Sequence, residues 1–440
     1  MNIGVVSLGC PKNLVDSEVM LGFIKENKWN IVNDPSVADI IIVNTCGFIT
    51  SAKEESINTI LQMAEYKKSA HCKKLIVTGC LGQRYAKDLF QDMPEIDAVV
   101  GTECYDNIAS VITRVLNDER FILVKDPKDY SQKNNRVLTT PKYFAYLKIA
   151  EGCDNGCSYC AIPMIRGPYR SRPYEEIIEE AKNLVQNGVK EIILVAQDTT
   201  RYGEDLYGKL RLVELLNDLN SLEDLKWIRI LYSYPQYFTD ELISAMKNLD
   251  KVCKYVDIPL QHASDSLLYS MNRFDTRESV EKLLSKLRKE IPNLCIRTTF
   301  IVGFPGETDE QFNELKDFVE KEKFNCAGVF TYSQEEGTVA GKMENQVPEE
   351  VKQDRFHELM TIQAEISEEI QQSREEKVYD VIIEGFDSDN PDLAVGRSMW
   401  EAPDIDGKVF VENGKGLKVG DFIKVKISQG FTYEVVGEKV

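Results

Sequence analysis

The first 125 residues alternate short apolar runs with longer segments in which apolar residues recur every three to four positions. The short runs predict buried strands, and the longer period predicts amphipathic helices. The expected strands are Ile3–Ser7, Ile40–Asn44, Lys74–Thr78 and Ala98–Gly101, with an edge strand at Phe121–Val124. The expected helices are Leu14–Glu26, Ser51–Tyr66, Gln83–Gln91 and Asp106–Leu116. This alternation predicts a parallel sheet with right-handed crossovers.

The same alternation returns after residue 140. The segment 125–142 is polar, contains Pro127 and Pro141 and shows little periodicity, so we interpret it as a linker. The strands expected after it are Tyr143–Ile149, Glu191–Ala196, Trp227–Leu231, Tyr255–Ile258, Cys295–Val302 and Cys326–Thr331, each followed by a helical pattern or a turn. Six strand–helix repeats are too few to close an eight-stranded barrel. We therefore expect an open (β/α)6 partial TIM barrel, whose side cleft could admit a macromolecular substrate.

The pattern changes again near residue 335. A stretch rich in Gly, Glu and Pro, Glu335–Glu349, predicts a second linker, and an apolar stripe along Val351–Lys377 predicts a long helix. The remaining residues alternate in strand fashion at Val378–Ile383, Val409–Val411, Phe422–Ile427 and Tyr433–Val436, with glycines between them. These short strands predict a small antiparallel β-barrel. We expect an α/β protein with three domains, at residues 1–125, 140–375 and 376–440.

Composition places the chain among ordinary soluble globular proteins. It has 440 residues, of which 43% are hydrophobic and 28% charged, and no apolar run is long enough to span a bilayer. The amino terminus enters a strand directly, without the pattern of an export signal, so we expect a cytoplasmic protein without a membrane partner. The net charge of −19 argues against broad nucleic-acid binding and favours encounter with a basic macromolecule.

Eleven cysteines in such a chain indicate metal or redox chemistry rather than disulfides. Cys153, Cys157 and Cys160 follow the first strand of the expected barrel, with the spacing Cys-x3-Cys-x2-Cys. Three thiols on one short loop can bind one face of a 4Fe–4S cluster and leave one iron open. Zinc would need a fourth ligand, and no Cys or His pair lies nearby in the sequence. Three unrelated buried thiols are the other alternative.

This spacing, with Tyr159 just before the last cysteine, resembles the radical S-adenosylmethionine (SAM) enzymes. The resemblance implies that the open iron binds the amino and carboxylate groups of SAM and that Tyr159 packs near the adenine. It also implies that the glycine-rich turn containing Gly303 and Gly306 lies near SAM. The same turn fits equally well a tight connection from strand to helix, with Thr308 as the N-cap.

A second set of cysteines follows successive strands of the first expected domain. Cys10, Cys46 and Cys80 each lie in the first turn after a strand and next to a glycine, so a parallel sheet would bring all three to one edge. Helix N-termini at these positions favour thiolates, and three thiolates can hold a second 4Fe–4S cluster. The alternative is that they are small buried hydrophobic residues. Cys104 could be a fourth ligand, although we interpret Cys104 and Cys72 as incidental and Cys253, Cys295 and Cys326 as core residues.

Together the two sets resemble the methylthiotransferases, which are radical-SAM enzymes with two clusters. The head, Ser7–Asn13, and the tail stretch Arg397–Gly407 are similar to the ribosomal-protein aspartate methylthiotransferases. The resemblance implies that Cys10, Cys46 and Cys80 hold an auxiliary cluster and that SAM and an electron donor are required. It further implies methylthiolation of the β-carbon of an aspartate in small-subunit ribosomal protein S-twelve. The tail barrel resembles TRAM domains.

The charge of the tail separates the alternatives. Residues 377–440 carry eight basic and twelve acidic residues, a net charge of −4, which is the wrong sign for strong RNA binding. This disfavours methylthiolation of a tRNA adenosine, the nearest alternative, and favours a basic protein partner. A noncatalytic iron–sulfur carrier would explain two clusters but not a partial barrel with loops that line a cavity.

Four further polar residues lie near the expected site. His262 is either a loop histidine with its hydrogen bonds satisfied, the interpretation that we favour, or a general base. Arg166, Arg170 and Arg172 follow the cluster loop and could pair with a carboxylate of SAM or of the substrate. They could equally be surface charges.

Overall fold

The computed structural model describes residues 1–126 and 136–440, so half of the expected first linker lies outside the described residues. The amino-terminal part forms a six-stranded parallel sheet with the order β2-β1-β3-β4-β5-β6. Its strands are β1 Asn2–Ser7, β2 Asn30–Val32, β3 Ile40–Thr45, β4 Lys74–Gly79, β5 Ala98–Val100 and β6 Phe121–Leu123. Its helices are α1 Pro11–Glu26, α2 Thr50–Ser69, α3 Cys80–Arg84, α4 Ala86–Asp92 and α5 Ile108–Leu116. The parallel sheet is confirmed, but the sequence reading missed β2, which has only three residues at the sheet edge.

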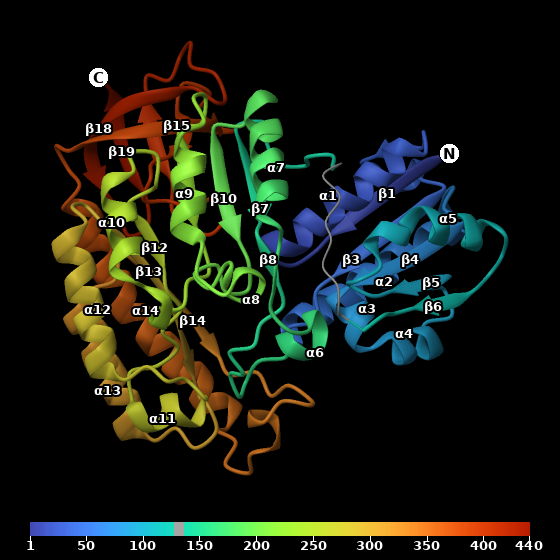
Figure 1. Cartoon of the computed structure of the whole chain (residues 1–440), viewed down its shortest axis with the longest axis horizontal. Helices are drawn as coiled ribbons and strands as arrows, with labels where there is room; N and C mark the ends of the chain where they lie inside the picture. The colour runs from blue at the N-terminus through green and yellow to red at the C-terminus, as the bar shows by residue number, and fades with distance from the viewer. Residues whose placement is uncertain (127–135) are drawn as a thin grey trace.

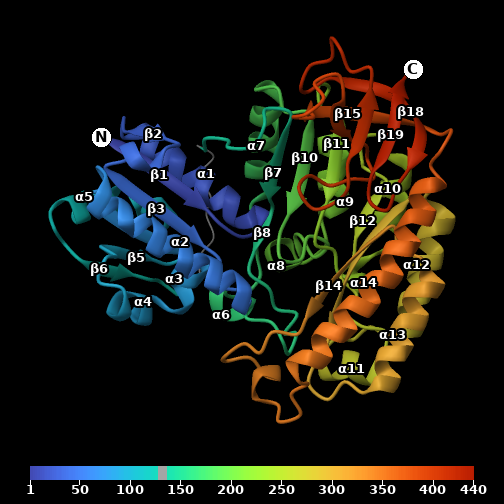
Figure 2. The same ribbon diagram turned by 180° about the vertical axis from the view of Figure 1, so that it is seen from behind.

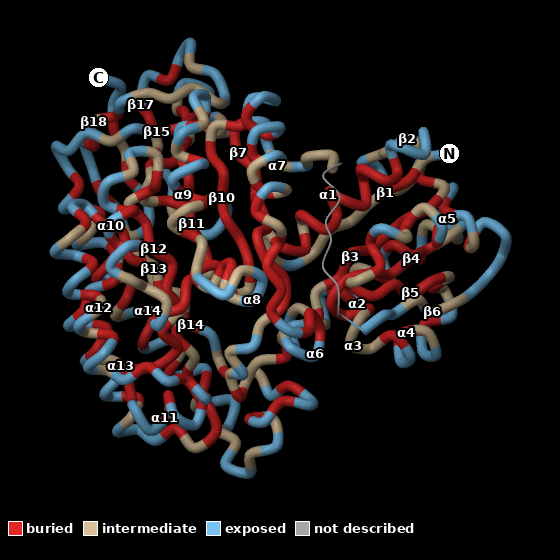
Figure 3. Tube along the Cα trace, in the orientation of Figure 1, coloured by how far each residue is buried: buried red, intermediate tan, exposed pale blue. Residues whose placement is uncertain are grey.

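This sheet has helices on both faces. The central strand β3 is buried along its whole length, which explains its continuous apolar run. One face packs against α1 and α5, and the other packs against α2 and α4. Buried residues are accordingly concentrated in the strands and in the inward sides of these helices (Figure 3).

The middle of the chain forms an open partial barrel, as the strand–helix alternation predicted (Figure 1). Its parallel strands are β7 Phe144–Lys148, β10 Glu191–Val195, β11 Trp227–Ile230, β12 Tyr255–Asp257, β13 Cys295–Val302 and β14 Cys326–Thr331. They form two three-stranded sheets, β11-β10-β7 and β12-β13-β14, and an isolated bridge between Ile228 and Val252 joins them. The barrel does not close, so other parts of the chain pack against the open side of its interior.

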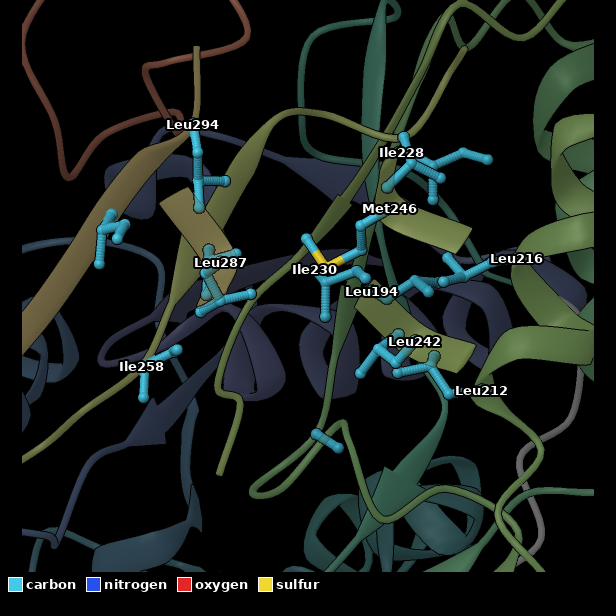
Figure 4. Packing of buried hydrophobic residues seen from close by; sticks show 14 of the residues in the cluster. Leu194, Leu212, Leu216, Ile228, Ile230, Leu242, Met246, Ile258, Leu287 and Leu294 are labelled. Atoms are coloured by element: carbon cyan, nitrogen blue, oxygen red, sulfur yellow. The ribbon is translucent and has the colours of Figure 1, made fainter. Parts of the chain in front are cut away.

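Helices cover the outside of the barrel: α7 Tyr174–Gln186, α9 Leu212–Asn220, α10 Asp240–Asn248, α12 Arg277–Glu290, α13 Asp309–Glu322 and α14 Glu349–Gln372. Short elements add α6 Ile162–Arg166, α8 Glu204–Tyr207, α11 Asp265–Ser270, β8 Ala150–Glu151 and β9 Arg170–Ser171. Side chains such as Leu194, Leu216 and Met246 fill the layer between strands and helices (Figure 4). The expected second linker is not a free connection, because Glu335 and Ala340 within it are buried.

The tail forms a closed five-stranded barrel with the order β15-β16-β17-β19-β18. The strands are β15 Val378–Phe386, β16 Ala394–Arg397, β17 Val409–Glu412, β18 Phe422–Gly430 and β19 Val435–Lys439. Two details differ from the expectation. The strand β16 was not predicted, because Gly396 and Arg397 interrupt its apolar pattern, and the barrel is not wholly antiparallel, since β17 and β19 pair in parallel.

The inward face of the partial barrel is where all three parts of the chain meet. One apolar cluster contains Val15 of α1, Tyr146 and Tyr255 of the barrel strands, and Ile382 and Ala402 of the tail. In both views α1 lies beside β7, and the tail barrel lies beyond the amino-terminal end of that strand (Figures 1 and 2). The described helices include none with the length and apolar character needed to cross a membrane.

Candidate active site

The loop with Cys153, Cys157 and Cys160 begins directly after β8, at the carboxyl end of the first barrel strands. Gly152 has a φ of +76°, and a Cβ there would lie 1.9 Å from the carbonyl oxygen of Pro168, so only glycine fits. The loop is held by its backbone: Cys153 N–H donates to Gly167 (3.2 Å) and Ser158 N–H donates to Met271 (2.9 Å). A strand end and two neighbouring loops thus fix the conformation of the loop.

The three thiols of this loop lie close enough to influence one another. Burial raises the pKa of Cys153 to about 12, and the charge of Cys157 adds to that shift. Burial likewise raises the pKa of Cys160, with contributions from Cys157 and Cys153. Each of the three is half-buried rather than sealed in the core. A cationic cluster would supply the charge that stabilises these buried thiolates.

Cys10, Cys46 and Cys80 follow β1, β3 and β4, which are adjacent strands of the amino-terminal sheet. A Cβ on Gly9 would lie 3.3 Å from the Sγ of Cys46, so the turn that carries Cys10 touches Cys46. Burial raises the pKa of Cys46 to about 12, and Cys80 and Cys10 both contribute to the shift. The structure therefore brings the second set of thiols together at one sheet edge, as expected.

The arrangement of possible ligands bears on whether the triads would hold a cluster or a single metal ion. Among residues 1–126 and 136–440, no group of three His, Cys, Asp or Glu side chains is arranged to hold one metal ion. The ligands of a cubane bind different irons and stand farther apart than those around one tetrahedral zinc. Each cysteine triad, Cys10/Cys46/Cys80 and Cys153/Cys157/Cys160, offers three thiolates, the ligand type that 4Fe–4S clusters take.

Arg166 follows the loop of one triad in the sequence and contacts the other triad at Cys80. Its Nη1 is 2.6 Å from Asp16 Oδ2 and 3.3 Å from Glu151 Oε2, and its Nη2 donates to Cys80 Sγ across 3.4 Å. Lys148 forms ion pairs with the same two carboxylates. Burial acts to raise the pKa of Glu151, but Arg166 and Lys148 outweigh it and hold that pKa well below its usual range. A buried, ionised network thus joins α1 to the cluster loop.

Arg170 and Arg172 are also buried, so the interpretation of these arginines as surface charges is wrong. They do pair with carboxylates, but with those of the protein itself. Arg170 Nη2 lies 3.0 Å from Glu103 Oε1, and Arg172 Nη1 lies 2.8 Å from Glu180 Oε2. Like Arg166, Arg170 bridges the amino-terminal sheet and the barrel.

His262 is buried in the loop that follows β12. Its Nδ1 accepts a hydrogen bond from Ser264 N–H (3.0 Å), and its Nε2 lies 3.5 Å from Glu307 Oε1. Glu307 in turn accepts from the backbone N–H groups of Gly303 and Phe304. Nε2 of His262 makes no hydrogen bond to the described residues, so the favoured interpretation of a loop histidine with its hydrogen bonds satisfied holds at Nδ1 only.

The two elements expected near SAM lie side by side. Tyr159 packs against an apolar cluster that includes Phe304 of the glycine-rich turn. Gly303 has a φ of +72° and Gly306 one of +82°, and a Cβ on Gly303 would lie 2.2 Å from Lys352 Cγ. Thr308 caps α13 in a capping box, so the turn also serves the purely structural role considered above. The contact of Tyr159, Gly303 and Gly306 with SAM stays a prediction.

Sequence reasoning missed Lys12 and Tyr232. Lys12 Nζ lies 3.3 Å from the centre of the Tyr232 ring and donates to the carbonyl oxygen of Ala196 (3.3 Å). Tyr232 has a φ of +61°, which is rare for an aromatic residue and leaves no trace in the sequence. Burial lowers the pKa of Lys12, against the opposing effects of Cys10 and Glu151. In the sequence, only the position of Lys12 two residues after Cys10 could have indicated that Lys12 lies near the site.

The remaining cysteines lie apart from both triads. Cys104 is fully buried in the apolar cluster around α5, and Cys72 donates from its thiol to the Lys74 carbonyl oxygen (3.3 Å). Cys253, Cys295 and Cys326 belong to the apolar cluster inside the partial barrel. These positions agree with structural roles.

Comparison with known proteins covers the whole chain. Family models match for the radical SAM superfamily (residues 147–319), the uncharacterized protein family UPF0004 (residues 2–101) and the TRAM domain (residues 377–440). The ribosomal protein uS12 methylthiotransferase RimO of Desulforamulus reducens is 53% identical over 439 residues, 99% of each chain. The protein of the same name from Clostridium novyi is 52% identical, over 99% of this chain and 97% of that one.

A solved structure shares the fold. The radical SAM methyltransferase TsrM of Kitasatospora setae, with cobalamin and a 4Fe-4S cluster bound, is similar with a TM-score of 0.56 over 75% of this chain and 72% of that chain. Its sequence identity is 12%, so the likeness concerns architecture only.

Proposed function

Because the chain belongs to the family of ribosomal protein uS12 methylthiotransferases, RimO, we propose that it adds a methylthio group to the β-carbon of an aspartate in uS12. The same proposal divides the chain into residues 1–125 for an auxiliary cluster, 140–375 for the radical SAM core and 376–440 for a TRAM-like barrel. The enzyme is a SAM-dependent transferase of sulfur-containing groups with two 4Fe-4S clusters.

The reaction requires the removal of hydrogen from an unactivated carbon, which acid–base side chains cannot achieve. Cys153, Cys157 and Cys160 would hold the cluster that, with SAM bound and one electron supplied, would give a carbon radical for that step, and Cys10, Cys46 and Cys80 would hold the cluster that would supply the sulfur. The chain's own task is to hold both sites and the target carbon at short range and to exclude water. Tyr159, Gly303 and Gly306 would contact SAM.

The observation that supports this proposal is the contact of Arg166, which follows one triad, with Cys80 of the other. Its guanidinium contacts Cys80 of one triad and Asp16 of the same part of the chain, while Arg166 itself follows the loop of the other triad. If the two triads had unrelated roles, the parts of the chain that carry them would not need to share a buried network. Its ion pairs also leave Arg166 engaged by the protein, so it is not the free partner of a substrate carboxylate.

The substrate assignment rests on further support. The acidic tail suits a basic ribosomal protein better than RNA, and the tail segment Arg397–Gly407 is held on the barrel by contacts such as Tyr255 to Asp406 (2.7 Å). A ribosomal-protein substrate would place the reaction in the cytoplasm and would require an electron donor there. Strong RNA binding by the tail is not expected.

The test is an anaerobic assay of the reconstituted enzyme with SAM and a reductant. Purified uS12 and bulk tRNA are offered in parallel, and both are analysed by mass spectrometry. A methylthio mass gain on a uS12 peptide that contains the target aspartate supports the proposal. A gain on a tRNA adenosine alone would keep the chemistry and overturn the substrate.

A further inference from the structure

Lys12 is a buried cation beside both triads. Only 7% of its surface is exposed, and its side chain crosses from α1 to the barrel, where it meets Ala196 after β10 and Tyr232 after β11. Lys12 lies near enough to Cys10 of one triad and to Cys160 of the other to interact electrostatically with both. No other Lys or Arg side chain reaches the described barrel strands from the turn that carries Cys10.

Lys12 differs from every other buried cation of the described residues in having no ion-pair partner within 4 Å. The others, each paired with an Asp or Glu, are Lys148, Arg166, Arg170, Arg172, Arg229, Arg273, Lys352, Arg355, Arg374 and Arg397. Of the charged groups, Cys10 acts most strongly on Lys12, although no hydrogen bond joins the two side chains. Asp257 and Glu151 act on Lys12 only from beyond that distance. Each has a cation of its own, because Asp257 pairs with Arg297 and Glu151 with Lys148.

A buried ammonium group without an anion is costly, and one carbonyl oxygen and one aromatic face compensate only part of that cost. Lys12 can donate three hydrogen bonds and makes one to the described residues. Its surroundings are also strained, since Tyr232 adopts a left-handed φ of +61° and so places its ring at the ammonium group. An arrangement of this kind fits a site that is completed when an anionic ligand binds.

We propose that Lys12 binds the side-chain carboxylate of the aspartate that is modified. This inference rests on the proposed function and deepens it, because it names the group that selects the target residue. The β-carbon of an aspartate is bonded directly to its carboxylate carbon. A carboxylate held at Lys12 would therefore place the β-carbon beside both triads, where hydrogen removal and sulfur delivery must meet.

The position of Lys12 also accounts for selectivity. A desolvated ammonium group discriminates strongly against a neutral amide of the same shape, because the charge would then stay unpaired. Asparagine in place of the target aspartate should therefore bind poorly. An adenine base, which has no carboxylate, should be rejected for the same reason.

The test compares two uS12 peptides, one with the target aspartate and one with asparagine at that position. Their affinities are measured anaerobically, by fluorescence anisotropy, for the enzyme with both clusters and SAM but without reductant. We expect the wild-type enzyme to bind the aspartate peptide about 10- to 100-fold more tightly. Lys12→Met should reduce this preference to less than about threefold by weakening only the aspartate peptide, and Lys12→Arg should restore part of it.

Two controls separate binding from structure. Lys73→Met removes an exposed lysine paired with Asp39 and should leave both affinities unchanged. Iron content should be the same in Lys12→Met and in the wild type, which would show that both clusters are still held. If Lys12→Met instead loses iron, a crystal structure of the wild-type enzyme with the aspartate peptide tests the inference. A carboxylate oxygen within hydrogen-bonding distance of Lys12 Nζ supports the inference, and a carboxylate bound elsewhere overturns it.

Other outcomes contradict the inference outright. An equal loss for both peptides in Lys12→Met would show that Lys12 serves the fold or balances the charge of the auxiliary cluster. Unchanged affinities would show that another group selects the aspartate. If the wild-type enzyme adds no methylthio group to uS12 at all, the proposed function fails. If it does so but binds both peptides equally, only the role of Lys12 fails.

Discussion

The guanidinium of Arg166 donates a hydrogen bond to the Sγ of Cys80 across 3.4 Å. Arg166 ends the short helix after one cysteine triad, whereas Cys80 belongs to the other triad, in a different part of the chain. The contact shows that Cys80 belongs to the same buried polar network as the helix that follows the other triad. Buried ion pairs of Arg166 and Lys148 therefore join the amino-terminal part of the chain to the partial barrel.

Replacing Arg166 should destabilise the protein strongly. Arg166→Met leaves Asp16 and Glu151 buried with Lys148 as their remaining cation, and such a change typically costs about 3–5 kcal/mol. The thermal unfolding midpoint should fall clearly below that of the wild type. Arg114→Met, which breaks an exposed pair with Glu119, should cost about 0–1 kcal/mol. Equal midpoints for the two variants would contradict the role of the network.

Glu191 should make the docking of the tail depend on pH. It pairs with Arg229 (2.8 Å) and with Arg397 of β16 (2.6 Å). Burial acts to raise the pKa of Glu191, but Arg397 and Arg229 outweigh it and lower that pKa below its ordinary value of 4.5. Because the folded-state pKa is depressed, the stabilisation is complete above pH 4.5 and is lost as the pH falls through the lower folded value.

The measurement is the difference in unfolding midpoint between the wild type and Glu191→Gln. This difference should be constant between about pH 8 and pH 5 and should shrink at lower pH. Glu214→Gln, which removes a surface carboxylate paired with Lys209 and Arg211, provides the control with a small difference throughout. A difference for Glu191→Gln that grows on acidification would refute the assignment.

The same reasoning about particular residues shows what the sequence could predict. Continuous apolar runs such as Ile40–Asn44 identified buried strands, and cysteines placed after strands identified both triads. The strands β2 and β16 escaped because neither is a continuous apolar run: β2 begins with Asn30, and β16 contains Gly396 and ends with Arg397. Short strands gain their stability from neighbours already in the sheet, which the local sequence does not reveal.

Ion pairs between residues far apart in the chain also could not be predicted from the sequence. Lys148 and Asp16 are 132 residues apart, and Glu191 and Arg397 are 206 residues apart. Arginines after the cluster loop were therefore compatible with surface charges or with ligand binding, whereas the fold pairs them internally. The strained φ of Tyr232 is likewise imposed by tertiary packing.

Glu335 should keep the two cluster-bearing parts of the chain together. Its buried carboxylate lies 2.6 Å from Arg84 Nη1 and 2.8 Å from Lys53 Nζ, and Arg84 also donates to the Gly47 carbonyl oxygen next to Cys46. Glu335→Gln should speed amide exchange on both sides of this contact and should increase SAM cleavage that yields no methylthio product. Glu336→Gln, an exposed neighbour, is the matched control. If Glu335→Gln changes neither the amide exchange nor the fraction of SAM cleavage that yields methylthio product, Glu335 does not have this role.

The glycines of the predicted SAM turn should differ in their tolerance of alanine. Both have positive φ, which costs an alanine about 1–2 kcal/mol. Gly303→Ala would in addition drive a Cβ into the buried stem of Lys352, whereas Gly306→Ala would meet only Asn345 at 3.4 Å. Gly303→Ala should therefore lower the unfolding midpoint and the affinity for SAM more than Gly306→Ala. The reverse order in calorimetry would show that the turn is shaped by the ligand rather than by α14.

The most direct test of the account is a matched set of cysteine variants assayed anaerobically with SAM, reductant and uS12. Cys157→Ala and Cys46→Ala should each lower the iron content from about eight to about four per chain, since each removes a ligand of one cluster. Cys157→Ala should abolish cleavage of SAM, whereas Cys46→Ala should still cleave SAM but form no methylthio product. Cys104→Ala should behave like the wild type. Methylthio product from Cys46→Ala, or cleavage of SAM by Cys157→Ala, would contradict the division of labour between the two triads.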